Sequence, residues 1–318
     1  MSQQGRPFLH QDASANSLGL ARILVFGIWF YELAVDPIQH LAELPASAFS
    51  PPGILRLLPD QLWNLLLSSS FLFTLKGGIL IGLALVILGL THSKIILGLI
   101  VGALVIYQGI LRGFSGHMNH AELALLYISA LFVFFPVFDG LALRRPRAIT
   151  GQKDPDETTA RDRAPYVTAM IAACALLSLT YCFVGAVRIW KGIGLFGTPA
   201  LRDHVANLAI QGGQFDGNTI IPVDVAAAVL GLPLGLFQFF FVITTLFELM
   251  APLAIFGRLL RFVIVSGLVL FHVSAWAFMN IPFWENMCLL VLFSGTWFHQ
   301  VAAWLGRLTE RSQAVKTA

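Results

Sequence analysis

The sequence predicts an all-α protein, a polytopic membrane helical bundle of about eight transmembrane helices. Of the 318 residues, 57% are hydrophobic and only 12% are charged, and the mean hydropathy is +0.78. An average soluble domain carries about 25% charged residues. The apolar residues also gather in runs close to the roughly 20 residues that a helix needs to cross a bilayer. We therefore expect the lipid bilayer to be the main surroundings of the chain.

Eight apolar segments follow one another along the chain, and each is interpreted as one span. They are residues 18–35, 71–90, 95–112, 119–138, 165–187, 235–256, 262–280 and 284–305.

Polar residues mark the boundaries of these spans. We expect Ser17 to cap the first helix, and Thr91 to Lys94 to form a tight connection between the second and third. Asn280-Ile281-Pro282 is predicted to end one helix and begin the next, since proline disfavours a helical residue before it. Two further segments, 36–70 and 188–234, are longer than simple turns, and the sequence leaves open whether they enter the membrane.

The distribution of Lys and Arg predicts an orientation. With eight spans, most cationic residues fall on the side that holds both termini, which the positive-inside rule assigns to the cytoplasm. This gives a cytoplasmic N-terminal segment at 1–17, a transmembrane domain at 18–305 and a cytoplasmic tail at 306–318. We expect a multi-pass protein of the cell membrane, namely a bacterial inner membrane.

A few ionisable and amide side chains interrupt the apolar segments. A charge at bilayer depth costs at least about 2.5 kcal/mol, so such residues usually face a bundle interior or an aqueous cavity. The residues in question are Arg22, Glu32, His117, Asn119, His120, Arg188, Glu248, His272 and Asn280.

The predicted orientation places several of these residues in the outer leaflet, where they can line one outward-facing polar pocket. We predict that His120, Arg188 and His272 are catalytic, because imidazoles carry protons near neutral pH and a guanidinium stabilises negative charge. Substrate-binding positions are expected at His117, Asn119, Lys191, Asn280 and Glu32.

Structural roles are open for the same residues. Arg22 is expected to pair with Glu248 as a structural ion pair within the membrane. His272 can instead hold a neighbouring helix by a hydrogen bond. Arg188 and Lys191 can anchor their helix at the lipid headgroups.

Several functional classes are not supported. His117 and His120 have a spacing that suits one helical face, but no carboxylate accompanies them as in a di-iron motif, and no metal site is predicted. The sequence lacks GxSxG, HExxH and Walker motifs. Cationic residues lie in loops and form no basic stripe, so nucleic acid is not expected as a partner. Cys174, Cys182 and Cys288 lie in apolar runs and suggest small core residues.

Five short motifs, in order, resemble the membrane domain of the vitamin K-dependent gamma-carboxylases and their bacterial relatives, the horizontally transferred transmembrane (HTTM) family. They are SLGLARILVFGIWF, MNHAELALLYISALFVFFP with the Asn119-His120 pair, YCFVGAVRIW, FELMAP and FHVSAWAFMNIPFWENM. The resemblance covers roughly residues 17–300. It implies a helical bundle with a lipid-accessible pocket that accepts a quinone or another isoprenoid-like ligand.

One departure from the family pattern limits what the resemblance implies. Arg188 stands where the carboxylases have a base lysine, and a guanidinium stays protonated, so protein carboxylation is not expected. The leading hypothesis is an enzyme that acts by proton transfer on a quinone, isoprenoid or other lipid-delivered substrate. The alternative is a non-catalytic membrane scaffold, or a maturation factor for an exported peptide or a membrane complex. A transporter is the third possibility.

Overall fold

A computed structural model of the chain describes residues 10, 12–115, 120–143, 160–204, 231–279, 283–295 and 297–317. Within these ranges every regular element is helical and none is a strand. The chain divides into two compact units. Unit 1 comprises residues 1–11 and 173–295, and unit 2 comprises residues 12–172 and 296–318.

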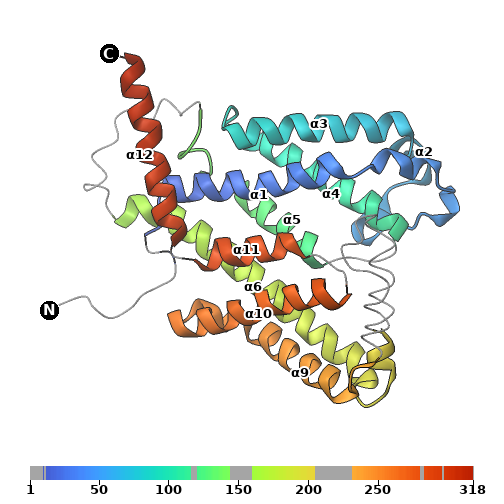
Figure 1. The fold of residues 1–318 in the computed structure, drawn as a ribbon. Helices are drawn as coiled ribbons and strands as arrows, with labels where there is room; N and C mark the ends of the chain where they lie inside the picture. Colours follow the sequence, from blue (N-terminus) through green and yellow to red (C-terminus); the bar gives the residue numbers. More distant parts are fainter. Residues whose placement is uncertain are drawn as a thin grey trace. The chain divides into compact units, whose positions relative to one another are not determined.

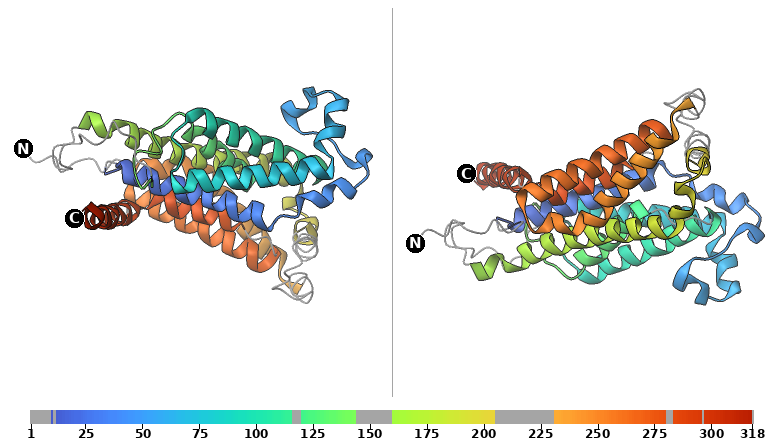
Figure 2. Two further views of the ribbon diagram at one scale, coloured as in Figure 1. Left: turned by 90° about the horizontal axis from the view of Figure 1, so that it is seen from above. Right: turned by 90° about the horizontal axis from the view of Figure 1, so that it is seen from below.

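Unit 2 is built on three long helices, α1 (Ala15–Val35), α3 (Ser69–Leu88) and α4 (Lys94–Ser115). α1 packs along α3, which in turn packs against α4, as the blue and cyan ribbons of Figures 1 and 2 show. α12 (Trp297–Thr317) is also long and packs against α1. The shorter elements are η1 (Ile38–Glu43), η2 (Ala46–Ala48), η3 (Gly53–Leu57), α2 (Asp60–Leu66) and α5 (His120–Phe132).

The first helix begins slightly earlier than predicted. Ser14, not Ser17, is the N-cap of α1, and its hydroxyl accepts a hydrogen bond from the Ser17 backbone N–H. Ser17 returns the contact by accepting from the Ser14 N–H, which completes a capping box. The side chain of Ser17 also contacts His299 of α12, with 2.9 Å between Oγ and Nδ1. The prediction was three residues late because either serine suits an N-cap by sequence, and in the structure Ser17 is instead the N3 residue of the capping box.

The predicted connection at Thr91 to Lys94 is confirmed. α3 ends at Leu88, followed by Gly89 in the left-handed region with φ of 63°, where a residue without Cβ is least strained. The Ser93 hydroxyl then accepts from the N–H of Ile96 in the first turn of α4. Turn and cap together allow α3 and α4 to form a tight helical hairpin.

Arg22 is fully buried in unit 2 and binds backbone carbonyls. Its Nη1 donates to the carbonyl of Val137 at 3.0 Å, and its Nη2 donates to those of Leu141 at 2.7 Å and Ile87 at 3.4 Å. The guanidinium thus satisfies carbonyls at the end of α3 and in the turns that follow α5. This arrangement joins three segments of unit 2 around one charged side chain.

Unit 1 contains the part of α6 (Ala160–Phe196) from Ala173 onward, together with α9 (Leu234–Met250), η6 (Ala251–Ile255), α10 (Arg258–Met279) and α11 (Trp284–Ser294). α10 contacts α9, η6 and α11. Glycines allow close approach, since a Cβ at Gly192 of α6 would lie 2.9 Å from the ring of Phe241, and one at Gly267 of α10 would lie 2.5 Å from that of Phe247. α9 therefore packs closely against both of its neighbours.

Six of the eight predicted spans coincide with helices that are long and apolar enough to cross a bilayer: α1, α3, α4, α6, α9 with η6, and α10. These helices make the chain a membrane-embedded, multi-pass protein.

The two remaining spans differ from the prediction. The apolar helix expected at 119–138 ends at Phe132 and continues as turns around Pro136, which lacks the N–H that a helix needs. The one expected at 284–305 is divided into α11 and α12, with Gly295 in an extended conformation after Ser294. Counted as one broken span, this pair would raise the number to seven.

Candidate functional site

A cavity of about 350 Å³ lies in unit 1, among α6, α9, α10 and the segment around Leu201. We call it the α9–α10 cavity. Its walls are mainly leucine and phenylalanine side chains, and among the lining residues that the structure describes Arg188 is the charged one. The other main lining residues are Leu236, Phe237, Phe240, Phe241, Thr244, Phe247, Val263, Leu270 and Phe271.

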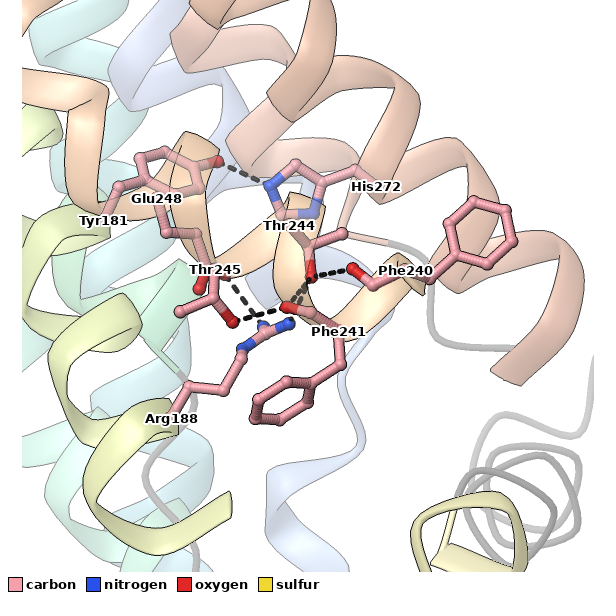
Figure 3. A network of polar contacts seen from close by, with 8 residues as sticks. All are labelled: Tyr181, Arg188, Phe240, Phe241, Thr244, Thr245, Glu248 and His272. Atoms are coloured by element: carbon pink, nitrogen blue, oxygen red, sulfur yellow. Dashed lines mark hydrogen bonds and ion pairs between the residues drawn. The ribbon is translucent and has the colours of Figure 1, made fainter. Parts of the chain in front are cut away.

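Arg188 projects from α6 toward α9 and forms a partly buried ion pair there (Figure 3). Its Nη2 donates to Glu248 Oε1 at 2.8 Å, and its Nη1 donates to Thr244 Oγ1 at 3.0 Å. The guanidinium carbon also lies 4.9 Å from the centre of the Phe271 ring. The Arg188 side chain keeps 24% of its surface exposed, whereas that of Glu248 is fully buried.

The predicted pair of Arg22 and Glu248 is therefore wrong. Glu248 pairs with Arg188, and Arg22 binds carbonyls of unit 2. Glu248 lies one helical turn after Thr244 on α9, so both face α6. The second carboxylate oxygen, Oε2, is buried and has no hydrogen-bond partner among the residues that the structure describes.

Tyr181 and His272 form a second polar pair, which joins α6 to α10 (Figure 3). The Tyr181 hydroxyl and His272 Nε2 are 2.6 Å apart, and both side chains are fully buried. The His272 ring lies 5.2 Å from that of Phe283, centre to centre. Tyr181 precedes Arg188 by seven residues, or two helical turns, so both side chains lie on the same face of α6.

Of the three predicted catalytic residues, the structure places Arg188 and His272 in unit 1, and Arg188 alone lines the cavity. His272 lies between the lining residues Phe271 and Ala275 but contacts Tyr181 behind the wall. His120 is the first residue of α5 in unit 2, and its side chain lies outside the described part.

The predicted substrate-binding residues are not brought together within the described ranges. Lys191 is exposed on α6 and is not a lining residue of the α9–α10 cavity. Glu32 lies near the end of α1 in unit 2. His117, Asn119 and Asn280 lie outside the described residues.

Sequence reasoning missed Tyr181 and Thr244. Both lie within apolar runs, and neither carries a charge that would mark it as unusual in a membrane helix. A usable signal existed in the spacing, because Tyr181, Gly185, Arg188 and Gly192 recur on one face of α6. A stripe of small and polar residues at this interval is typical of a helix-packing face in membranes.

Within the ranges that the structure describes, no three His, Cys, Asp or Glu side chains are grouped so that they could hold a metal ion. The cysteines described, Cys174, Cys182 and Cys288, are free thiols.

Comparison of the chain with protein-family models, with curated proteins and with solved structures found no match. The interpretation of the site therefore depends on the geometry and chemistry of its residues. These comprise an apolar cavity, one guanidinium in its wall, a buried carboxylate that pairs with it, and a Tyr–His pair close behind.

Proposed function

We propose that this membrane protein takes a lipid-delivered ligand into the α9–α10 cavity and transfers a proton to or from it. The observation that carries the proposal is the lining itself: a cavity of about 350 Å³ whose walls are leucine and phenylalanine, with Arg188 as its charged group. Small-molecule sites are typically apolar cavities in which a few polar groups fix the ligand's orientation. An apolar tail and an oxygen-bearing head suit such a cavity.

The ligand classes that fit are a quinone, an isoprenoid or another single-chain lipid. Arg188 can donate hydrogen bonds to a carbonyl oxygen but cannot act as a base, because it remains protonated. The motif resemblance to the HTTM family supports a quinone. The positive-inside rule predicts a protein of the bacterial inner membrane with both termini in the cytoplasm. In this orientation the cavity would face outward.

The Tyr181–His272 pair supports the proton-transfer part of the proposal. A neutral imidazole accepts a proton at one nitrogen while the other donates, so the pair can hold a proton or pass it on. Tyr181 lies within electrostatic reach of Glu248, which binds Arg188 in the cavity wall. We assign His272 a positioning and proton-holding role behind the wall, and Arg188 the role of binding the ligand's head.

Equilibrium binding of radiolabelled decylubiquinone to the protein in lipid nanodiscs tests the proposal. Ser266 is an exposed lining residue of α10, and Ser266→Phe should narrow the cavity and weaken binding by about tenfold. Ala277→Phe is the matched control, because Ala277 is exposed on the same helix and does not line the cavity. Equal binding by both variants and the unaltered protein would place the ligand elsewhere and overturn the proposal.

A second candidate function is a non-catalytic scaffold, which is favoured by one observation. The Arg188 guanidinium already donates to Glu248 and Thr244, as is expected for a residue whose ion pair is structural. Replacing both charges together, with Arg188→Met and Glu248→Met, removes the pair without leaving a lone buried charge, a change that many proteins tolerate. A scaffold predicts that neither the unaltered protein nor the double variant binds decylubiquinone in the cavity, whereas the ligand-binding function predicts binding by the unaltered protein and its loss in the double variant.

A further inference from the structure

The Arg188–Glu248 pair has a net charge of zero, but its two charges lie at different distances from the α9–α10 cavity. Arg188 lines the cavity, while Glu248 is fully buried behind it and is not a lining residue. A ligand that enters the cavity therefore meets the cation first. Its counter-charge lies one hydrogen bond further in, at 2.8 Å.

Polar groups other than the guanidinium offer a ligand few donors. The Thr244 hydroxyl donates to the carbonyl of Phe240 at 2.7 Å, and the Ser274 hydroxyl donates to that of Leu270 at 2.8 Å. Both hydroxyls are thereby committed to their own helices, a common arrangement for Ser and Thr in membrane segments. The Arg188 guanidinium and the exposed Ser266 hydroxyl are left among the described lining residues to bind the head of a ligand. A guanidinium can only donate, so the head beside Arg188 is an acceptor, and an anionic oxygen is the acceptor that pairs with it most strongly.

Among the described residues, Arg188 of α6 pairs with Glu248, and Tyr181 of the same helix lies within electrostatic reach of it. His272 of α10 and Glu285 of α11 belong to the same set through Tyr181, which His272 contacts and Glu285 reaches electrostatically. Arg188 is the single permanent cation in this set.

An anionic head beside Arg188 would give this buried site a net charge of −1 if Glu248 remained ionised. Unbalanced charge in an apolar interior is strongly unfavourable, and groups in proteins usually neutralise by taking up or releasing a proton. Protonation of Glu248 restores neutrality, because the guanidinium then pairs with the incoming anion and the glutamic acid is uncharged. The buried oxygen Oε2, which lacks a partner among the described residues, can receive the proton.

We propose that the α9–α10 cavity binds a single-chain amphiphile with an anionic oxygen head, and that Glu248 takes up one proton for each anion bound. This inference rests on the proposed function and specifies the ligand's charge. In the balanced step, the Arg188 Nη2 hydrogen bond passes from Glu248 Oε1 to the anion, and one proton supplied by the acid form of the buffer adds to Oε2. No electrons move, and the site remains neutral before and after binding.

Amphiphiles with one common chain and different heads test the inference. Isothermal titration of the protein in nanodiscs, in buffers of different ionisation enthalpy, counts the protons taken up. Dodecanesulfonate keeps its charge at neutral pH and should bind with uptake of about one proton, with an affinity that rises about tenfold for each unit by which the pH falls. Dodecanol should bind with no uptake and no dependence on pH.

A variant that imitates the protonated acid sharpens the test. Glu248→Gln keeps the shape of the side chain and removes its charge, so it should bind dodecanesulfonate about tenfold more tightly at neutral pH and without proton uptake. Glu43→Gln is the matched control, since Glu43 is exposed and pairs with His40 outside this site. The control should behave as the unaltered protein does.

The outcomes separate this inference from the proposed function. Binding of dodecanesulfonate without proton uptake, or weaker binding by Glu248→Gln, would overturn the inference. If decylubiquinone and dodecanol still bound in that case, the proposed function would stand. If no amphiphile bound, both would fall. Laurate and dodecyl phosphate distinguish the source of the anion: uptake with either supports the inference and identifies a carboxylate or a phosphate head.

Discussion

Gly185 of α6 lies directly against Glu248 of α9. A Cβ built on Gly185 would be 2.9 Å from the Glu248 Cβ and 3.1 Å from the backbone nitrogen of Leu249. The contact lies within one turn of Arg188, whose Nη2 donates to Glu248 Oε1. The absence of a side chain at Gly185 is thus what lets α6 and α9 approach closely enough for the ion pair to form.

Substitution of Gly185 by alanine should separate the two helices. The added methyl group meets the backbone of α9, which cannot move aside as a flexible side chain can, so we expect a loss of about 1–3 kcal/mol in unfolding free energy. Gly194→Ala on the same helix is the control, because a Cβ there meets nothing within 4 Å. It should leave stability unchanged or raise it by up to about 1 kcal/mol. Thermal unfolding in detergent compares the two, and equal losses would contradict the packing role of Gly185.

Arg22 should be essential for the stability of unit 2. In Arg22→Met the side chain remains long but loses its charge and its donors. The carbonyls of Val137 and Leu141 then have no hydrogen bond from this side chain, at about 1–3 kcal/mol for each that remains unsatisfied. Arg56→Met is the matched control, since Arg56 donates to the carbonyl of Pro51 at an exposed position. Unfolding in detergent should show a large loss for Arg22→Met and a small one for the control. Similar small losses in both would mean that water replaces the guanidinium.

The spans were predictable where an apolar run is long and ends in a cap or a turn. α3 and α4 satisfy this, with Gly89 and Ser93 between them. The end of α5 was missed because apolar residues continue beyond Phe132, so that hydropathy gives no sign of the turns around Pro136. Hydropathy indicates whether a segment is apolar enough to lie in lipid, but a single proline can prevent the backbone from continuing as a helix.

Arg188 and His272 could be selected from the sequence because ionisable groups are rare in apolar helices. The partner of Glu248 could not be identified from the sequence, because several helices carry polar residues that could lie at the same depth in the membrane. Contact between α6 and α9 is decided by Gly185 and Gly192, whose effect depends on which helix faces them. Thr244 gave no signal because an uncharged hydroxyl within an apolar run is common in membrane helices.

Asp36, which follows α1, should make unit 2 less stable as the pH rises. Burial raises the pKa of its carboxyl, while the hydrogen bond from Tyr107 and the charges of Lys76 and Arg112 act in the opposite direction. A carboxyl with a higher pKa in the folded state binds its proton more tightly there. Its contribution to stability is therefore complete below the unfolded pKa of about 4 and is lost as the pH rises through the raised value.

Asp36→Asn tests this dependence, because the amide oxygen can still accept from Tyr107 but does not titrate. Unfolding measured across the acidic range should show a shallower fall with pH in Asp36→Asn than in the unaltered protein. Asp60→Asn, at the exposed start of α2, is the control and should keep the original slope. An unchanged slope in Asp36→Asn would assign the pH dependence to other groups.

The hydrogen bond between Tyr181 and His272 should appear as coupling between α6 and α10. Tyr181→Phe and His272→Gln each remove one partner of a contact that is fully buried, so the two losses should not add. Interhelical hydrogen bonds in membranes are worth about 0.6–1.7 kcal/mol, and we expect a coupling energy in that range from the double-mutant cycle. A second cycle, of Tyr181→Phe with Ser274→Ala, provides the control, because the Ser274 hydroxyl bonds to Leu270 of its own helix. Additive losses in both cycles would show that Tyr181 and His272 act independently, and a relay of protons between them would then lose its structural basis.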